Sequence, residues 1–290
     1  MVDPKIITHP HGDRTFTSAL YYGADVRESL RRLQAGSVQC VVTSPPYWGL
    51  RSYLGDGDPL KGSEIGSEPT PEEYVNSMVD VFREVKRVLR DDGVLWLNLG
   101  DSYAVYHGNS RVPDADAPSN KPGYTENQRS STVGIGGLKA KDLVGIPWRV
   151  AFALQADGWY LRSDVIWAKG SCMPESVTDR PTRSHEYVFL LTKNARYFYD
   201  ADAVKEPLKD DTLKDLERHG GERGKRERNV GGRNDGYTVA RGTVGNAAGR
   251  NRRTVWSLAT ESRPVARLRP DLTPEQRAYV VVKLTALGLL

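Results

Sequence analysis

The chain has 290 residues, enough for one large domain or for a domain with an elaboration. Hydrophobic residues make up 38% of it and charged residues 27%, and no apolar run approaches the ~20 residues of a membrane span. Together with two isolated cysteines and a polar N-terminus, this composition excludes a membrane-embedded protein and predicts a cytoplasmic one.

The net charge of +4 is unevenly distributed along the chain. Residues 218–253 include ten basic and three acidic side chains, so their local balance is +7 and that of the remainder is −3. A basic segment on a nearly neutral body is typical of a surface that meets phosphate. The alternative interpretation is a solvated, flexible charged loop.

The N-terminal elements are short. Residues 1–18 read as an irregular lead-in and residues 19–22 as a strand, and a helix is predicted over 26–33. Asp25 stands at the strand-to-helix turn, a position that favours an N-cap because its carboxylate accepts hydrogen bonds from the first free amides of a helix.

The next strand carries the most informative turn of the chain. Residues 38–42 form an apolar, β-branched run too short for a helix, which predicts a buried strand. It continues into Ser44-Pro45-Pro46-Tyr47, where two prolines remove backbone donors and end the strand. Ligands of open α/β sheets bind at the carboxyl ends of strands. The Ser44 hydroxyl, the Pro45 carbonyl and the Tyr47 ring suit a planar ring that bears an amine, although a turn whose aromatic residues only pack is the simpler alternative.

The remaining elements alternate between helix and strand, which predicts an α/β fold. A helix with a capping Thr70 is followed by a strand, a long loop, a second helix, two strands and a short hairpin strand. The predicted ranges are 70–89, 94–99, 104–137, 148–156, 159–167, 186–192 and 194–200.

The Ser-Pro-Pro-Tyr turn resembles the catalytic motif of the β-group DNA amino-methyltransferases, which transfer a methyl group from S-adenosylmethionine. In that family a serine at the first position is typical of cytosine-N4 enzymes, and aspartate or asparagine of adenine-N6 enzymes. Other family stretches occur here in the usual order, and the resemblance covers roughly residues 19–260. These stretches are 145–148, 162–169, 173–176, 179–186 and 197–200.

The resemblance implies a Rossmann-like methyltransferase sheet with an inserted DNA-recognition segment. It divides the chain into a catalytic half (1–205, with a loop at 104–137), a basic target-recognition segment (206–256) and a connector with a C-terminal helix (257–290). It also implies that a flipped cytosine of double-stranded DNA meets the catalytic turn, and that the turn and its surroundings bind S-adenosylmethionine. The catalytic residues are then Ser44, Pro45, Pro46 and Tyr47, and the cofactor-binding residues Asp25, Thr43 and Ser44.

The resemblance places DNA-contacting side chains in three regions, and no metal site is expected. For Arg180 and Arg183, internal ion pairs with Asp179 and Glu186 are an equal alternative to DNA contacts. Lys169 is better suited to binding a phosphate than to acting as a base. The predicted DNA-binding residues are Trp48, Arg51, Lys169, Arg180, Arg183, Arg250, Arg252 and Arg253.

One family feature is not found in the sequence. After residue 260, members continue into a glycine-rich loop that wraps the cofactor, whereas this chain has a basic connector and an apolar helix. The sheet is therefore expected to be incomplete, with an apolar edge at 38–42 that the C-terminal helix covers or a second chain completes. An adenine-N6 enzyme and a truncated or split, non-autonomous DNA-binding relative are the alternative functions. The recognition sequence, and whether a restriction nuclease accompanies the protein, stay open.

Overall fold

The computed structural model describes residues 4–11, 14–21, 24–50, 52–55, 57–104, 137–172, 174–208 and 249–258. The predicted long loop lies almost entirely outside these residues, as do most of the basic segment, the connector and the predicted C-terminal helix. Two compact units divide the described residues. The larger contains residues up to Phe198 and from Thr254 onward, and the smaller contains 199–208 and 249–253.

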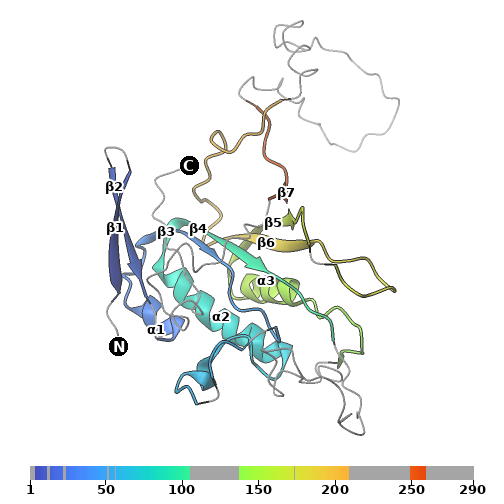
Figure 1. The fold of residues 1–290 in the computed structure, drawn as a ribbon. Helices are drawn as coiled ribbons and strands as arrows, with labels where there is room; N and C mark the ends of the chain where they lie inside the picture. The colour runs from blue at the N-terminus through green and yellow to red at the C-terminus, as the bar shows by residue number, and fades with distance from the viewer. Residues whose placement is uncertain are drawn as a thin grey trace, which may run out of the picture. The chain divides into compact units, whose positions relative to one another are not determined.

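A five-stranded mixed sheet forms the centre of the larger unit (Figure 1). Its order is β3-β4-β6-β5-β7, with β3 (Val38–Thr43) parallel to β4 (Leu89–Leu99) and β5 (Tyr160–Ala168) parallel to β7 (Val255–Ser257). The strand β6 (His185–Thr192) runs antiparallel to both of its neighbours. Among the described strands, β3 pairs only with β4.

The helices begin where local chemistry favours them. Helix α2 (Pro71–Val88) starts at Thr70, whose hydroxyl accepts a hydrogen bond from the Glu73 amide at 3.1 Å. Proline at its first position and acids in its first turn add to this start signal. The other helices are α1 (Val26–Arg31), α3 (Ile146–Ala156) and the 3-10 turn η1 (Lys61–Ser63). None of the helices in the described part of the chain is both long and apolar enough to span a membrane.

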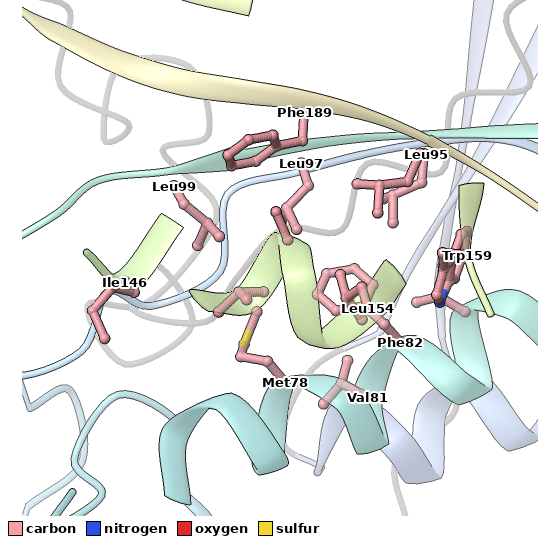
Figure 2. Packing of buried hydrophobic residues seen from close by; sticks show 14 of the residues in the cluster. Met78, Val81, Phe82, Leu95, Leu97, Leu99, Ile146, Leu154, Trp159 and Phe189 are labelled. Atoms are coloured by element: carbon pink, nitrogen blue, oxygen red, sulfur yellow. The ribbon is translucent and has the colours of Figure 1, made fainter. Parts of the chain in front are cut away.

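The core lies between one face of the sheet and helices α2 and α3. Leu95, Leu97 and Leu99 alternate along β4 and are fully buried, and Figure 2 shows them on the side of the strand that faces α3. Met78 and Phe82 of α2 complete this cluster. Burying each such side chain contributes about 1.5–3 kcal/mol, so this packing holds the end of β3 in place.

Two predicted elements are wrong. The lead-in is a hairpin of β1 (Lys5–His11) and β2 (Arg14–Leu20), whose residues show no regular alternation of polar and apolar side chains and so give no signal of a buried face. The hairpin strand predicted at 194–200 is absent, because 193–196 form bends and no strand is present from 197 to 200. In addition, β4 begins at Leu89, before the predicted start at 94, and its pairing with β3 is irregular between Val38 and Cys40 of β3.

Candidate active site

The Ser-Pro-Pro-Tyr turn follows β3 directly, and hydrogen bonds of two buried aromatic side chains hold it in place. Tyr74 of α2 is fully buried and donates its hydroxyl to the carbonyl oxygen of Pro46 at 2.9 Å. Trp48 is 3% exposed and donates its indole N–H to the carbonyl oxygen of Glu68 at 2.8 Å. By contrast, no described residue donates to the carbonyl oxygen of Pro45. The turn is therefore held rigidly while the Ser44 side chain remains exposed.

Tyr47 joins the turn to the two neighbouring strands of the sheet. Its hydroxyl oxygen lies 3.2 Å from Ser44 Oγ, 3.0 Å from Asn98 Oδ1 and 2.9 Å from Glu186 Oε2. Asn98 is on β4 and Glu186 on β6, and the second carboxylate oxygen of Glu186 is ion-paired with Lys169. Residues that are far apart in the sequence thus meet at the end of β3.

The ionisation states in this cluster follow from burial and from the lysine. Burial by itself raises the pKa of Glu186, but the ion pair with Lys169 and the hydroxyl of Tyr47 outweigh it, so the net pKa is lowered. Burial, with the nearby Glu186 charge, raises the pKa of Tyr47. Glu186 is thus a carboxylate and Tyr47 a neutral phenol at neutral pH.

Gly100, immediately after β4, makes room for the Tyr47 ring. A Cβ at this position would lie 2.4 Å from Cε2 of Tyr47 and 2.7 Å from its Cδ2, far inside van der Waals contact. The ring therefore takes its place only because residue 100 has no side chain.

A model of the N6_N4_Mtase family of DNA methylases matches residues 38–283, more than half of the chain and including the whole of this turn. The chain belongs to this DNA methylase family. The match begins at the first residue of β3 and continues beyond residue 260, where the motifs recognised in the sequence end.

Two type II methyltransferases are similar to this chain over much of its length. M.SmaI of Serratia marcescens is 45% identical over 240 residues, which are 83% of this chain and 66% of that protein. M.Cfr9I of Citrobacter freundii is 50% identical over 188 residues, which are 65% of this chain and 59% of that protein. The chain thus spans less than two thirds of either relative. A solved structure of the cytosine-N4-specific PvuII DNA methyltransferase has a TM-score of 0.41 at 16% identity and covers 69% of this chain and 62% of its own.

Asp25 is the N-cap of α1. Its carboxylate accepts the Arg27 amide at 2.7 Å and the Arg27 guanidinium at 2.6 and 2.9 Å. The hydrogen bond from the guanidinium is the main reason that the pKa of Asp25 is lowered. The capping role of Asp25 is thus present in the structure. Contacts of the cofactor with Asp25, and with Thr43 at the end of β3, stay predictions.

The cations predicted to contact DNA in the larger unit have partners inside the protein. Lys169 pairs with Glu186, as described above. Arg180 pairs with Glu175 and lies with its guanidinium carbon 3.9 Å from the centre of the Tyr103 ring. Arg183 lies 3.9 Å from the buried carboxylate of Asp101. Both arginines therefore have internal ion pairs, but with Glu175 and Asp101 in place of the expected Asp179 and Glu186.

The other residues predicted to bind DNA divide into three cases. Trp48 is a core residue with almost no accessible surface, so the expectation that it contacts DNA is not kept. Arg51 lies outside the described residues. In the smaller unit, Arg250 donates to Glu206 at 3.1 Å, and Arg252 and Arg253 have interactions of their own.

Sequence reasoning did not assign functional roles to Asn98 and Gly100. Asn98 is a polar residue between two leucines of an otherwise apolar strand, and this interruption is a signal that the sequence does contain. Nothing local indicates that Gly100 and Tyr47 touch, because the contact depends on the pairing of β3 with β4.

Replacing Asp25 separates its two candidate roles. Asp25→Ala should lower the free energy of unfolding by ~1 kcal/mol, because the α1 cap is lost, whereas Asp25→Asn should retain most of it. The contribution of the charge is present above the unfolded-state pKa near ~3.9 and is lost as pH falls through the lowered folded-state pKa. Urea unfolding at neutral and acid pH measures both effects. A large loss of S-adenosylmethionine affinity in a stable Asp25→Asn protein would show that the carboxylate also binds cofactor.

Proposed function

We propose that this chain is the catalytic part of a DNA methyltransferase that transfers a methyl group from S-adenosylmethionine to the N4 amine of cytosine. The observation that carries the proposal is the rigid turn at the end of β3. It carries the Ser44 hydroxyl and the Pro45 carbonyl on consecutive residues, with no described residue donating to the latter. Both oxygens accept hydrogens from an exocyclic amine, and the family match over this turn supports the assignment.

The proposed chemistry is direct transfer to a flipped cytosine that stacks on Tyr47. Hydrogen bonds from N4 to Ser44 and Pro45 draw the amine lone pair out of conjugation with the ring, so that N4 attacks the methyl group of the sulfonium in line. The bond between carbon and sulfur breaks as the bond between carbon and nitrogen forms. Positioning and electrostatics supply the rate, and no covalent enzyme intermediate is needed.

The test is methylation of unmethylated DNA of mixed sequence, which needs no knowledge of the recognition site. The purified chain is incubated with this DNA and labelled S-adenosylmethionine, and the DNA is digested to nucleosides for mass spectrometry. N4-methylcytosine is the expected product. N6-methyladenine would instead establish the adenine alternative, and the absence of any methylated base would contradict an autonomous enzyme.

The alternative of a split enzyme is favoured by the edge position of β3. Val42 on this strand is 57% exposed and Trp96, its partner on β4, is half-buried. Paired residues of neighbouring strands point to the same face of the sheet, so an exposed apolar surface adjoins the edge of β3, where a further strand would pair. If a second chain supplies the glycine loop, calorimetry should detect cofactor binding only after that chain is added. Tight binding of S-adenosylmethionine by the purified chain alone would exclude the split arrangement.

The basic segment of the smaller unit is proposed to hold the DNA backbone. Neutralising phosphates releases counterions, so the logarithm of affinity should fall linearly with the logarithm of salt concentration. Replacing Arg250, Arg252 and Arg253 with alanine should flatten this slope by ~0.9 for each phosphate that the protein no longer neutralises. Fluorescence anisotropy with a labelled duplex at several salt concentrations measures the slope.

A matched set of replacements removes the same charge from the larger unit. The side chains of these arginines are more than half exposed, so their ion pairs contribute little to stability. They are Arg31, Arg83 and Arg90. The slope should remain that of the unmodified protein in this control, and equal slopes in both triple variants would identify the basic segment as a solvated loop.

A further inference from the structure

A chain of hydrogen bonds leads from Ser44 into the protein. Ser44 Oγ lies 3.2 Å from the hydroxyl oxygen of Tyr47, which in turn lies 2.9 Å from a carboxylate oxygen of Glu186. The other oxygen of that carboxylate is ion-paired with Lys169. The four groups come from the turn after β3, from β6 and from the residue that follows β5, so only the folded sheet brings them together.

The direction of these hydrogen bonds follows from what each group is able to donate. The Glu186 carboxylate only accepts. Asn98 also presents an acceptor, because its amide nitrogen donates to the carbonyl oxygen of Tyr187 at 3.1 Å and its Oδ1 therefore faces Tyr47. Tyr47 has a single hydroxyl proton and two acceptors in reach, so this proton points away from Ser44.

The consequence concerns the lone pairs of Ser44. Since Tyr47 uses its proton elsewhere, the contact between the two hydroxyls requires Ser44 to donate and Tyr47 to accept. The Ser44 proton is thereby directed inward. The oxygen lone pairs are left for an incoming amine, which is the polarity that methyl transfer requires.

We propose that Ser44, Tyr47 and Glu186 form a proton relay, which carries the proton released by the target amine to the carboxylate of Glu186. The inference rests on the proposed methyl transfer and adds the destination of the proton. As N4 loses its hydrogen to Ser44 Oγ, the original Ser44 proton passes to Tyr47 and the Tyr47 proton passes to Glu186. Both hydroxyls end unchanged, and one proton has moved from the base to the carboxylate.

The charges balance along this path. Before the reaction the sulfonium carries one positive charge and Glu186 one negative charge; afterwards the thioether and the protonated carboxyl are both neutral. A methylated amine that has left conjugation with its ring is a strong acid, so an ionised carboxylate is a sufficient acceptor. Tyr47 gives up its proton only as it receives another, in keeping with a phenol whose burial disfavours the phenolate.

Glu186 is accessible to solvent and is held by Lys169. The Glu186 side chain is 15% exposed, which allows it to return the proton to solvent between turnovers. Lys169 keeps the resting carboxylate ionised and oriented, so Lys169 and Glu186 are positioning residues that act through Tyr47 and Ser44. A purely structural role for the network, fixing the Tyr47 ring for stacking, is the alternative that the experiment has to exclude.

Replacing Tyr47 with phenylalanine distinguishes the two roles, because the ring stays and only the relay hydroxyl is removed. In the methylation assay we expect kcat to fall on the order of 10²-fold while the affinities for DNA and cofactor stay constant. Combined with Ser44→Ala, Tyr47→Phe should cause no further loss, because the relay then has no first member. Full kcat in Tyr47→Phe, or losses that multiply in the double variant, would overturn the relay.

Glu186→Gln tests the far end, since an amide of the same shape is unable to take the proton, and kcat should again fall with unchanged affinities. Asp179→Asn is the matched control. It removes one negative charge from the same segment, where Asp179 pairs with the exposed Lys141, and should leave kcat unchanged.

A second measurement does not depend on activity. In protein labelled with ¹³C at the ζ carbon of tyrosine, the Tyr47 signal is the one that disappears in Tyr47→Phe. A phenol that donates to a carboxylate has its ζ-carbon signal shifted downfield, so Glu186→Gln should move the Tyr47 signal upfield and Asp179→Asn should not. A signal that Glu186→Gln leaves in place would overturn the relay. Absence of methyl transfer both by the unmodified chain and after addition of a second chain that carries the glycine loop would instead overturn the proposed function.

Discussion

Methyl transfer should fall by about 10²–10³-fold when Ser44 is replaced by alanine, with little change in DNA affinity. Ser44 is exposed at the end of β3, so the substitution leaves no buried cavity and the fold should be retained. The hydroxyl acts on the amine in the transition state, and its loss therefore lowers kcat rather than binding. Single-turnover methylation and anisotropy binding measure the two quantities separately.

Ser37→Ala is the matched control for this experiment. The Ser37 hydroxyl is exposed and bonds only to the nearby carbonyl oxygen of Gln34, at 2.7 Å. The Ser37→Ala substitution also removes a serine hydroxyl, just before β3, and should leave turnover unchanged. If Ser44→Ala retained the turnover of the control, Ser44 would have no part in catalysis, and the proposed mechanism would lose its central residue.

Gly100→Ala should have the second largest effect, because it forces the Tyr47 ring to move. The added Cβ would lie 2.4 Å from Cε2 of that ring. The hydroxyl group of the ring is hydrogen-bonded to Asn98 and Glu186. Displacement of the ring therefore breaks these hydrogen bonds and should cost about 1–3 kcal/mol of stability. A shift of the catalytic turn by ~1 Å is enough to lower kcat on the order of 10²-fold.

Two comparisons make the Gly100 result specific. A Cβ at Gly62 would meet no atom within 4 Å, so Gly62→Ala should be nearly neutral in both stability and turnover. In a Tyr47→Ala background the clash is gone, and Gly100→Ala should then add little to the loss of stability. Thermal unfolding of the four proteins decides the point, and a full additional loss in the double variant would place the strain somewhere other than at Tyr47.

Local patterns in the sequence were sufficient for the elements that carry strong signals. The apolar run at 38–42, followed by two prolines, correctly predicted β3 and the turn at its end. Thr70 with a following proline and two acids correctly predicted the start of α2. These signals are encoded within a few residues, because capping and the end of a strand depend on neighbouring backbone groups. The β1–β2 hairpin was not predicted, because its residues show no regular alternation of polar and apolar side chains that would indicate a strand.

The chemistry of the site was only half visible in the sequence. The residue types at Ser44, Pro45 and Tyr47 are enough to indicate an amine acceptor beside an aromatic ring, and the family comparison agrees with the class of protein inferred from them. The partners of Tyr47 were not visible, because Glu186 is 139 positions away and reaches it only across two neighbouring strands. Likewise, the ion pairs of Arg180 and Arg183 are chosen by which acids the folded chain brings near.

The amino-acid sequence by itself thus determined the fold class, the position of the Ser-Pro-Pro-Tyr turn and the family of the protein. Only the tertiary structure decided the direction of the hydrogen bonds at Ser44, since that direction depends on Asn98 and Glu186 converging on a single phenol proton. It also decided that residue 100 has to be glycine, because the pairing of β3 with β4 brings the Tyr47 ring to the place where a side chain would stand. Both are properties of strand pairing, which local sequence does not specify.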